Sequence, residues 1–183
     1  MRRRKTIILR IVFTVAIAFA VLIVGRFIYV ESERKSIIAN QLQAGDTAPD
    51  FTVNLLSGDT FTLSENKGKV VFLNFWATWC APCVAEMPAI QELSEEYSDD
   101  VIFIGVASHD STNKIQDLIT ERGFTYPIGL DESGDVKDLY PSLSTSYTLV
   151  IDAEGVISEI FLGGSDQTHD EFEAAITEAL NKQ

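Results

Sequence analysis

The apolar residues of the chain form one long run near the N-terminus. Residues 7–30 are almost wholly apolar, and Arg10 and Arg26 are the only charged residues among them. A helix of this length spans the roughly 30 Å of a membrane's hydrocarbon core, and arginine side chains near its ends reach the polar interface. The pattern predicts a transmembrane anchor within residues 1–35, followed by a tether of residues 36–43.

The charges around this run predict its orientation. Four basic residues occupy positions 2–5, and positive charge before a first span keeps the N-terminus in the cytoplasm. A cleaved signal peptide also begins in this way, but no small-x-small cleavage site stands between residues 24 and 36, which favours an uncleaved anchor. Residues 44–183 are therefore expected outside the cytoplasm, where disulfides persist.

Strand-like and helix-like patterns alternate in the first half of this exported domain. Two short apolar-polar runs surround residues 57–59, which is typical of a β-hairpin. Residues 70–75 and 101–107 are continuous apolar runs of strand length, and a helical pattern from Cys80 to Tyr97 lies between them. The apolar positions of that helix share one face: Val84, Met87, Ile90, Leu93 and Tyr97.

The second half of the domain continues the alternation. Residues 114–122 predict a helix that stops at Gly123, and residues 148–162 read as two strands joined at residues 153–155. A last helix is predicted to begin near Thr168, which has capping-box spacing with Glu171. It should bury Phe172, Ile176, Ala179 and Leu180. The expected fold class is α/β, a mixed sheet flanked by helices.

The charges of the exported domain exclude one class of partner. Residues 1–35 hold eight of the 14 basic and two of the 27 acidic residues, which leaves six basic and 25 acidic residues and a net charge of −19 for residues 36–183. Such an acidic domain repels nucleic acid, so no nucleic-acid partner is expected.

Cys80 and Cys83 are the only cysteines of the chain. As a structural staple they would close a loop of only four residues, which stabilises by roughly 2 kcal/mol. As a zinc clip they supply two ligands where a closed site needs four, and neither His109 nor His169 has a metal-site spacing to them. As a redox pair they stand at the start of a predicted helix, whose dipole favours a thiolate. The redox interpretation is favoured, with no metal and no cofactor.

Several stretches resemble the thioredoxin superfamily, and more closely its TlpA/ResA-like membrane-anchored thiol-disulfide oxidoreductases. They are GDTAPDF at residues 45–51, VVFLNFWATWCAPCVAEMP at 70–88, FTYPIGLD at 124–131 and LVIDAEG at 149–155. The resemblance implies a thioredoxin-like domain over residues 44–183, with disulfides of exported proteins as substrates. It also implies a membrane electron donor of the DsbD/CcdA type.

The resemblance assigns roles to the residues of the W-C-x-P-C motif and its surroundings. It makes Cys80 the exposed nucleophile, Cys83 the buried resolving thiol and Glu86 the family's active-site glutamate, with an ordinary helix-surface carboxylate as the lesser alternative for Glu86. Trp79 and Pro82 are expected around the active site, with Trp79 at its rim. The stretch between the cysteines, Ala81-Pro82, lacks the histidine of strongly oxidising members, which favours a reductant.

One position departs from the family pattern. A cis-proline normally stands in the loop that faces the cysteines, and Ser146 occupies its place before the LVID stretch. A cis bond before a non-proline residue costs about 2.5 to 4 kcal/mol, so Ser146 is expected to follow a trans bond in an altered loop.

Three other functions remain as alternatives. A peroxiredoxin-like peroxidase would carry threonine or serine where this chain has Ala77. A Sco-like copper carrier would separate its cysteines by three residues and use a distant histidine, for which His169 is the candidate; the safer interpretation places His169 in the first turn of the last helix. A non-enzymatic module with a vestigial cysteine pair is the third.

Overall fold

The computed structural model describes the backbone of residues 2–163 and 168–182. Side-chain surroundings are described for residue 13 and for residues 15–163 and 169–182. Contacts divide the chain into two units, Met1–Asn40 and Gln41–Gln183.

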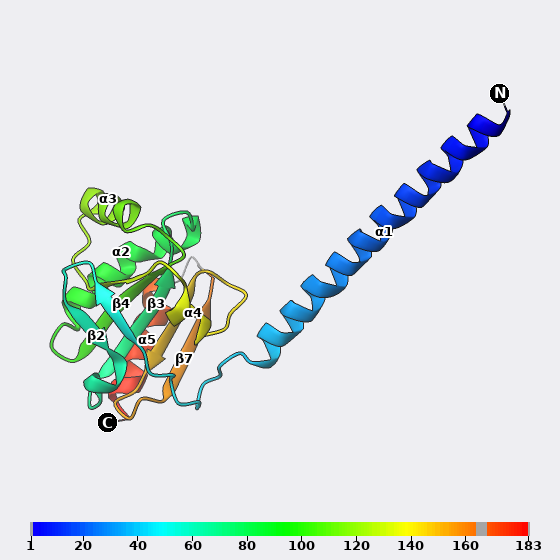
Figure 1. The fold of residues 1–183 in the computed structure, drawn as a ribbon. Helices are drawn as coiled ribbons and strands as arrows, with labels where there is room; N and C mark the ends of the chain where they lie inside the picture. Colours follow the sequence, from blue (N-terminus) through cyan, green and yellow to red (C-terminus); the bar gives the residue numbers. More distant parts are fainter. Residues whose placement is uncertain (1, 164–167, 183) are drawn as a thin grey trace. The chain divides into compact units, whose positions relative to one another are not determined.

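The first unit is a single helix, α1 (Arg2–Ala39) (Figure 1). Within it, the segment Val15–Ala39 contains an 18-residue window with a mean hydropathy of 1.9 and is long and apolar enough to cross a membrane. The helix continues through residues 36–39, which were expected to belong to the tether. Residues 31–39 contain neither glycine nor proline, so nothing in that stretch ends the helix.

The second unit is built on a seven-stranded mixed sheet in the order β2-β1-β5-β4-β3-β6-β7 (Figure 1). The strands are β1 (Thr52–Leu55), β2 (Thr60–Thr62), β3 (Val70–Trp76), β4 (Val101–Ser108), β5 (Ile128–Asp131), β6 (Tyr147–Ile151) and β7 (Ile157–Leu162). Strand β4 pairs in parallel with β3 and β5, and the other neighbours are antiparallel. All seven residues of β3 are buried, which explains why that stretch is apolar without alternation.

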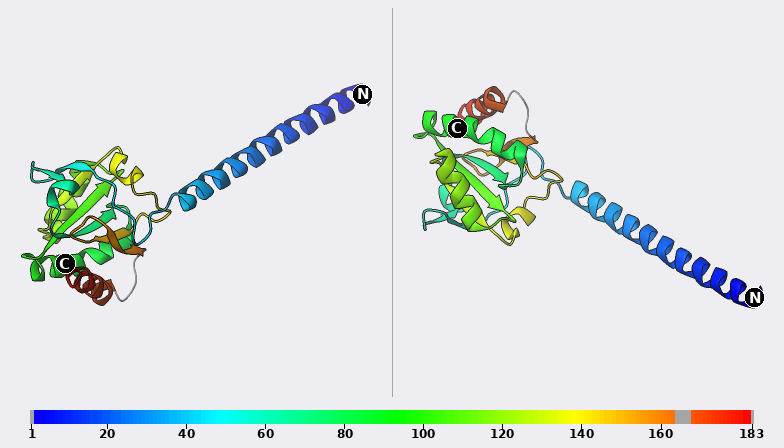
Figure 2. Two further views of the ribbon diagram at one scale, coloured as in Figure 1. Left: turned by 90° about the horizontal axis from the view of Figure 1, so that it is seen from below. Right: turned by 90° about the horizontal axis from the view of Figure 1, so that it is seen from above.

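Helices cover both faces of this sheet (Figure 2). One core contains buried residues of α2 (Ala81–Glu96), α3 (Thr112–Arg122) and α5 (Thr168–Leu180), packed against alternate residues of β3 such as Phe72 and Trp76. The opposite core contains the intervening β3 residues, Val71, Leu73 and Phe75, together with residues of η1 (Leu63–Asn66) and α4 (Asp135–Asp138).

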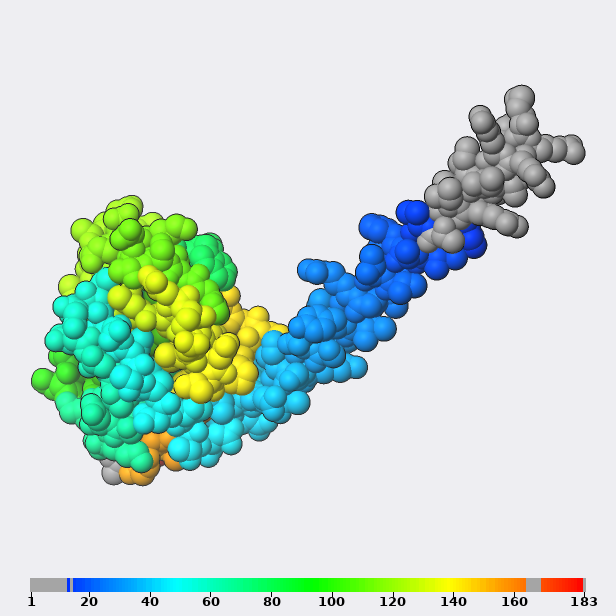
Figure 3. All heavy atoms as spheres, in the orientation of Figure 1, coloured from blue at the N-terminus to red at the C-terminus, as the bar shows by residue number. Residues whose placement is uncertain are grey.

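The segment around α4 packs against the start of the domain. The Tyr140 hydroxyl donates a hydrogen bond to the carbonyl oxygen of Pro49, and the Tyr140 ring meets the Phe51 ring edge-on with centroids 5.8 Å apart. Figure 3 shows the two segments, yellow and cyan, side by side at the surface. This packing closes the second face of the sheet without a long helix.

The predicted fold class is confirmed: the structure is an α/β domain with a mixed sheet flanked by helices. The hairpin, the two apolar strands, three helices and the final strand pair lie where their patterns predicted them. The pattern did not predict β5, a four-residue strand with Gly129 in it. A Cβ atom at Gly129 would lie 2.8 Å from Cγ1 of Val53 on β1, so the close packing of these strands requires glycine at this position. Because glycine is uncommon in strands, the same residue makes the strand hard to recognise in the sequence.

Candidate active site

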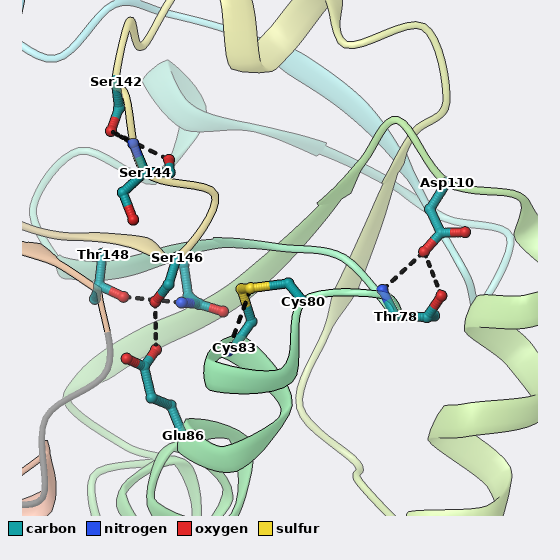
Figure 4. The surroundings of a disulfide bond; sticks show 10 residues. Thr78, Cys80, Cys83, Glu86, Asp110, Ser142, Ser144, Ser146 and Thr148 are labelled. Carbon is teal, nitrogen blue, oxygen red and sulfur yellow. Dashed lines mark hydrogen bonds between the residues drawn. A yellow bond between two sulfur atoms is a disulfide. The ribbon is translucent and has the colours of Figure 1, made fainter.

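The two cysteines lie at the start of α2, just after the loop that follows β3. Cys80 is the N-cap residue of α2, and Pro82 occupies the first turn, where helix N–H groups have no partner within the helix. A disulfide joins Cys80 to Cys83, with 5.3 Å between their Cα atoms. The Cys83 backbone N–H also points at Cys80 Sγ, at an N–S distance of 3.3 Å (Figure 4). The first turn of the helix therefore directs an N–H group at the sulfur that would carry negative charge.

Access to the two sulfurs is unequal. Cys80 retains 6% of its surface exposed, whereas Cys83 is fully buried. Trp79, immediately before Cys80, is 61% exposed. A molecule that approaches from solvent therefore meets Trp79 and Cys80 first, which is the order expected for a surface nucleophile and a buried partner.

An aspartate from the neighbouring strand fixes the loop before the cysteines. Asp110 follows β4, and its Oδ2 accepts hydrogen bonds from the backbone nitrogen and the hydroxyl of Thr78, at 2.7 Å and 2.6 Å (Figure 4). Burial alone would raise the pKa of Asp110, but these bonds and one from the Ser111 N–H outweigh it and hold the pKa below its usual value. The ionised carboxylate thus ties β4 to the cysteine loop.

Asp110 was not among the predicted site residues, although the sequence contained a usable signal. Parallel strands that are neighbours end at the same edge of a sheet. The residues that follow β3 and β4 are therefore expected to meet, and Asp110 is a polar residue two positions after the end of β4.

Glu86 is not a surface residue. It lies on α2 one turn after Cys83 and is only 3% exposed. Its Oε2 accepts a hydrogen bond of 2.8 Å from the hydroxyl of Ser146, which is also 3% exposed (Figure 4). Burial raises the pKa of Glu86, and the hydrogen bond from Ser146 offsets part of that rise. The structure therefore brings two of the predicted site residues into direct contact.

A second buried polar pair lies beside the first. Asn74 on β3 and Thr148 on β6 are directly opposite in the antiparallel register, and the Asn74 amide donates to the Thr148 hydroxyl at 2.8 Å. Side chains alternate along a strand, so Ser146 and Thr148 project to the same face of the sheet. Thr148 was not predicted, because its role depends on strand register.

The backbone at Ser146 agrees with the expectation for the missing proline. The described residues contain no cis peptide bond, so Ser146 follows a trans bond. Its carbonyl oxygen accepts a hydrogen bond from the N–H of Gly163, just after β7, at 3.0 Å. The start of β6 is therefore held from both sides, by Glu86 through the side chain and by Gly163 through the main chain.

Neither histidine forms a hydrogen bond with the cysteine pair among the described residues. His169 is in the first turn of α5, as predicted, and faces Glu92 and Asp170 at 3.8 Å and 3.6 Å. His109 lines an open hollow of about 410 Å³ together with Trp79, Asp110, Ser111, Lys114 and Glu132. This hollow continues the exposed surface that begins at Trp79.

Comparison with known proteins agrees with this geometry. The Redoxin family model matches residues 43–176. The thioredoxin-like protein YneN of Bacillus subtilis is 39% identical over 125 residues, 67% of this chain and 73% of that protein. The thiol-disulfide oxidoreductase ResA of Bacillus thuringiensis (strain Al Hakam) is 33% identical over 134 residues, 73% and 76% of the two chains.

The solved structures include close matches to the same fold. A candidate protein disulfide isomerase from Bacteroides thetaiotaomicron superimposes with a TM-score of 0.72 and 32% identity, over 76% of this chain and 91% of that one. Residues 43–176, which the Redoxin model matches, contain all seven strands of the sheet, the cysteine pair and Glu86.

Proposed function

The chain belongs to the Redoxin family and, within it, to the thioredoxin-like thiol-disulfide oxidoreductases of the ResA type, and from this premise we propose that it reduces disulfides in exported proteins. The observation that supports this proposal most directly is the Cys80–Cys83 disulfide at the start of α2, in which Cys80 keeps 6% of its surface exposed and Cys83 is fully buried. That asymmetry suits an exchange reaction in which one sulfur attacks and the other resolves.

The exchange begins on the reduced enzyme at Cys80. Its thiolate attacks one sulfur of a substrate disulfide, forming a mixed disulfide and expelling the other substrate sulfur as a thiolate, which takes a proton from solvent. The first turn of α2 favours the Cys80 thiolate through its dipole and through the Cys83 N–H.

Resolution requires the buried cysteine to lose its proton. Cys83 gives this proton to the Glu86 carboxylate, and the Cys83 thiolate attacks Cys80 Sγ. The Cys80–Cys83 bond forms, the bond to the substrate breaks, and the departing substrate thiolate takes up the proton. Two electrons have then passed from the dithiol to the substrate disulfide. Glu86, three residues after Cys83 on one helix face, is suitably placed for this transfer.

The direction of the reaction rests on the residues between the cysteines. Ala81 and Pro82 include no group that would strongly stabilise a thiolate beyond the helix itself, which supports a reductant with a potential nearer about −270 mV than −120 mV. A reductant outside the cytoplasm must be re-reduced, so the oxidised enzyme would exchange with a dithiol of a membrane donor of the DsbD/CcdA type.

The proposed location follows from α1. Its apolar stretch is long enough to cross a membrane, and the basic residues before it favour a cytoplasmic N-terminus. The enzyme would then be a single-pass membrane protein with its catalytic domain outside the cytoplasm.

Equilibration of the protein with dithiothreitol or glutathione buffers, followed by quantification of Cys80–Cys83 oxidation, tests the direction. We expect a potential close to that of thioredoxin and turnover of insulin disulfides that disappears in Cys80→Ser. A potential near −120 mV would make the enzyme an oxidant instead.

A further inference from the structure

The contact between Ser146 and Glu86 joins two elements that meet beneath the disulfide. Ser146 precedes β6 and Glu86 lies in α2, and both side chains are buried. Among the described residues, the Ser146 hydroxyl is the one hydrogen-bond donor to the Glu86 carboxylate. Proline at this position would have no side-chain donor, so the contact is a consequence of the serine.

We infer that Ser146 is a positioning residue for the resolving step: its hydroxyl binds the Glu86 carboxylate, favours the ionised form and holds it in place to accept the proton of Cys83. This inference rests on the proposed function and adds a role for the residue that departs from the family pattern. Ser146 itself does not touch the reacting sulfurs in this role. It acts through Glu86.

The surroundings of Ser146 make its hydroxyl a fixed donor. The Gly163 N–H binds the Ser146 carbonyl, which anchors the main chain at the start of β6. The hydroxyl oxygen of Thr148, the neighbouring buried hydroxyl on this face, accepts a hydrogen bond from the Asn74 amide. Figure 4 shows the Glu86 carboxylate extended toward Ser146 beside the disulfide.

The surroundings of Glu86 explain why a donor is needed. Removal from water disfavours the charged form of a buried carboxylate, and a hydrogen bond donated to that carboxylate favours it. The titratable groups that face Glu86 are Cys83 on its own helix and Tyr126 before β5. Burial, and after it the charge of Glu86, raises the pKa of Tyr126. The residues that α5 and β7 contribute to this core are apolar, including Phe161, Phe172 and Ile176. Ser146 is therefore the described group that favours the ionised form of Glu86.

The resolving step can be observed with an aromatic disulfide, dithiobis(nitrobenzoate), mixed with the reduced protein. The first nitrothiobenzoate is released when Cys80 attacks, and the second is released when Cys83 resolves the mixed disulfide. Stopped-flow absorbance separates the two phases. The rate of the second phase should fall as the pH is lowered and Glu86 becomes protonated. We call this part of the pH profile the acidic limb, and Glu86→Gln should lack it.

Ser146→Ala is the principal test variant. We expect the acidic limb of its second phase to move upward by about one pH unit, which slows resolution about tenfold on that limb, while the first phase keeps its rate. Ser108→Ala is the matched control, because Ser108 is a buried serine that donates a 2.8 Å hydrogen bond to a buried carboxylate, Asp131, on the other face of the sheet. The control should leave the limb unchanged.

A second pair of variants keeps the test valid if Ser146→Ala does not fold. Ser146→Thr retains the hydroxyl, and Ser146→Val has nearly the same shape without it. The limb should stay in place in the threonine variant and move upward in the valine variant. Second-phase profiles of Ser146→Ala, or of the threonine and valine pair, that coincide with the wild type would overturn the role of Ser146. Absence of any second phase in the wild type would instead overturn the proposed exchange mechanism.

Discussion

Asp110 holds Thr78 through two hydrogen bonds to a single carboxylate oxygen, and this contact fixes the chain two residues before Cys80. Asp110 lies after β4, and Thr78 lies after β3. The two strands are parallel neighbours in the centre of the sheet. The rigid part of the fold is thereby connected directly to the reactive loop.

Asp110→Asn should destabilise the protein by roughly 1 to 3 kcal/mol at pH 7, because it weakens two hydrogen bonds to a charged acceptor. The pKa of Asp110 is lower in the folded protein than its usual value. Its contribution is therefore complete above the pKa of an unfolded aspartate, about 3.9, and is lost as pH falls through the lower folded value. Urea unfolding at several pH values should show the difference between the two proteins shrinking below about pH 4.

The control for this substitution is Asp117→Asn on the exposed side of α3, which changes the net charge equally. It should change the free energy of unfolding by no more than about 0.5 kcal/mol. A pH-independent effect of Asp110→Asn would show that its carboxylate is not the source of the stabilisation.

Trp79→Ala should affect protein substrates more than small ones. The side chain is largely exposed, so its loss should leave the free energy of unfolding within about 0.5 kcal/mol of the wild type. As a large aromatic surface beside Cys80, it is suited to contact a protein substrate, and its truncation should slow insulin reduction about tenfold. The reaction with a small aromatic disulfide should keep its rate.

A matched control is Leu139→Ala, which truncates an exposed apolar side chain after α4, on the other face of the sheet. It should leave both reactions unchanged. Equal slowing of the small disulfide by Trp79→Ala would place the effect on the cysteines rather than on substrate contact.

The sequence carried enough information for the core of the fold because its strongest patterns are local. The continuous apolar run of β3 and the one-sided pattern of α2 are each visible within a dozen or so residues. The cysteines stand at the junction of these two elements, so their position at a helix N-terminus could be predicted. In contrast, α4 has only four residues and no periodicity to detect.

The contacts of the site were harder to predict because they depend on register. Glu86 and Ser146 are 60 residues apart, and Thr78 and Asp110 are 32 residues apart. The sequence left Glu86 open between an active-site and a surface position. Its contact with Ser146 depends on the register of β6, since a shift of one residue in that strand would turn Ser146 to the other face of the sheet.

Cys83→Ser should trap the enzyme on its substrates. Cys80 remains able to attack, but the mixed disulfide has no internal thiol to resolve it. Cells that produce the full-length variant should contain higher-mass adducts on non-reducing gels, and these should disappear with dithiothreitol. Cys80→Ser is the control and should form no adducts, because the remaining Cys83 is fully buried. Adducts that are equally abundant in both variants would contradict the assignment of Cys80 as nucleophile.

Glu86→Gln should stabilise the oxidised protein while it impairs exchange. Burial raises the pKa of Glu86 in the folded protein, so the neutral carboxyl is favoured more in the native state than in the unfolded chain. The contribution of Glu86 to stability is therefore most favourable at low pH and declines as pH rises through the folded pKa. Glutamine is neutral throughout. The free energy of unfolding, measured in urea with the disulfide intact, should accordingly rise in Glu86→Gln relative to the wild type as the pH increases from about 4 to 8. Over the same range the variant should resolve mixed disulfides more slowly, because its amide cannot accept the Cys83 proton. If the difference in the free energy of unfolding between Glu86→Gln and the wild type is the same at pH 8 as at pH 4, the burial of Glu86 does not disfavour its ionised form.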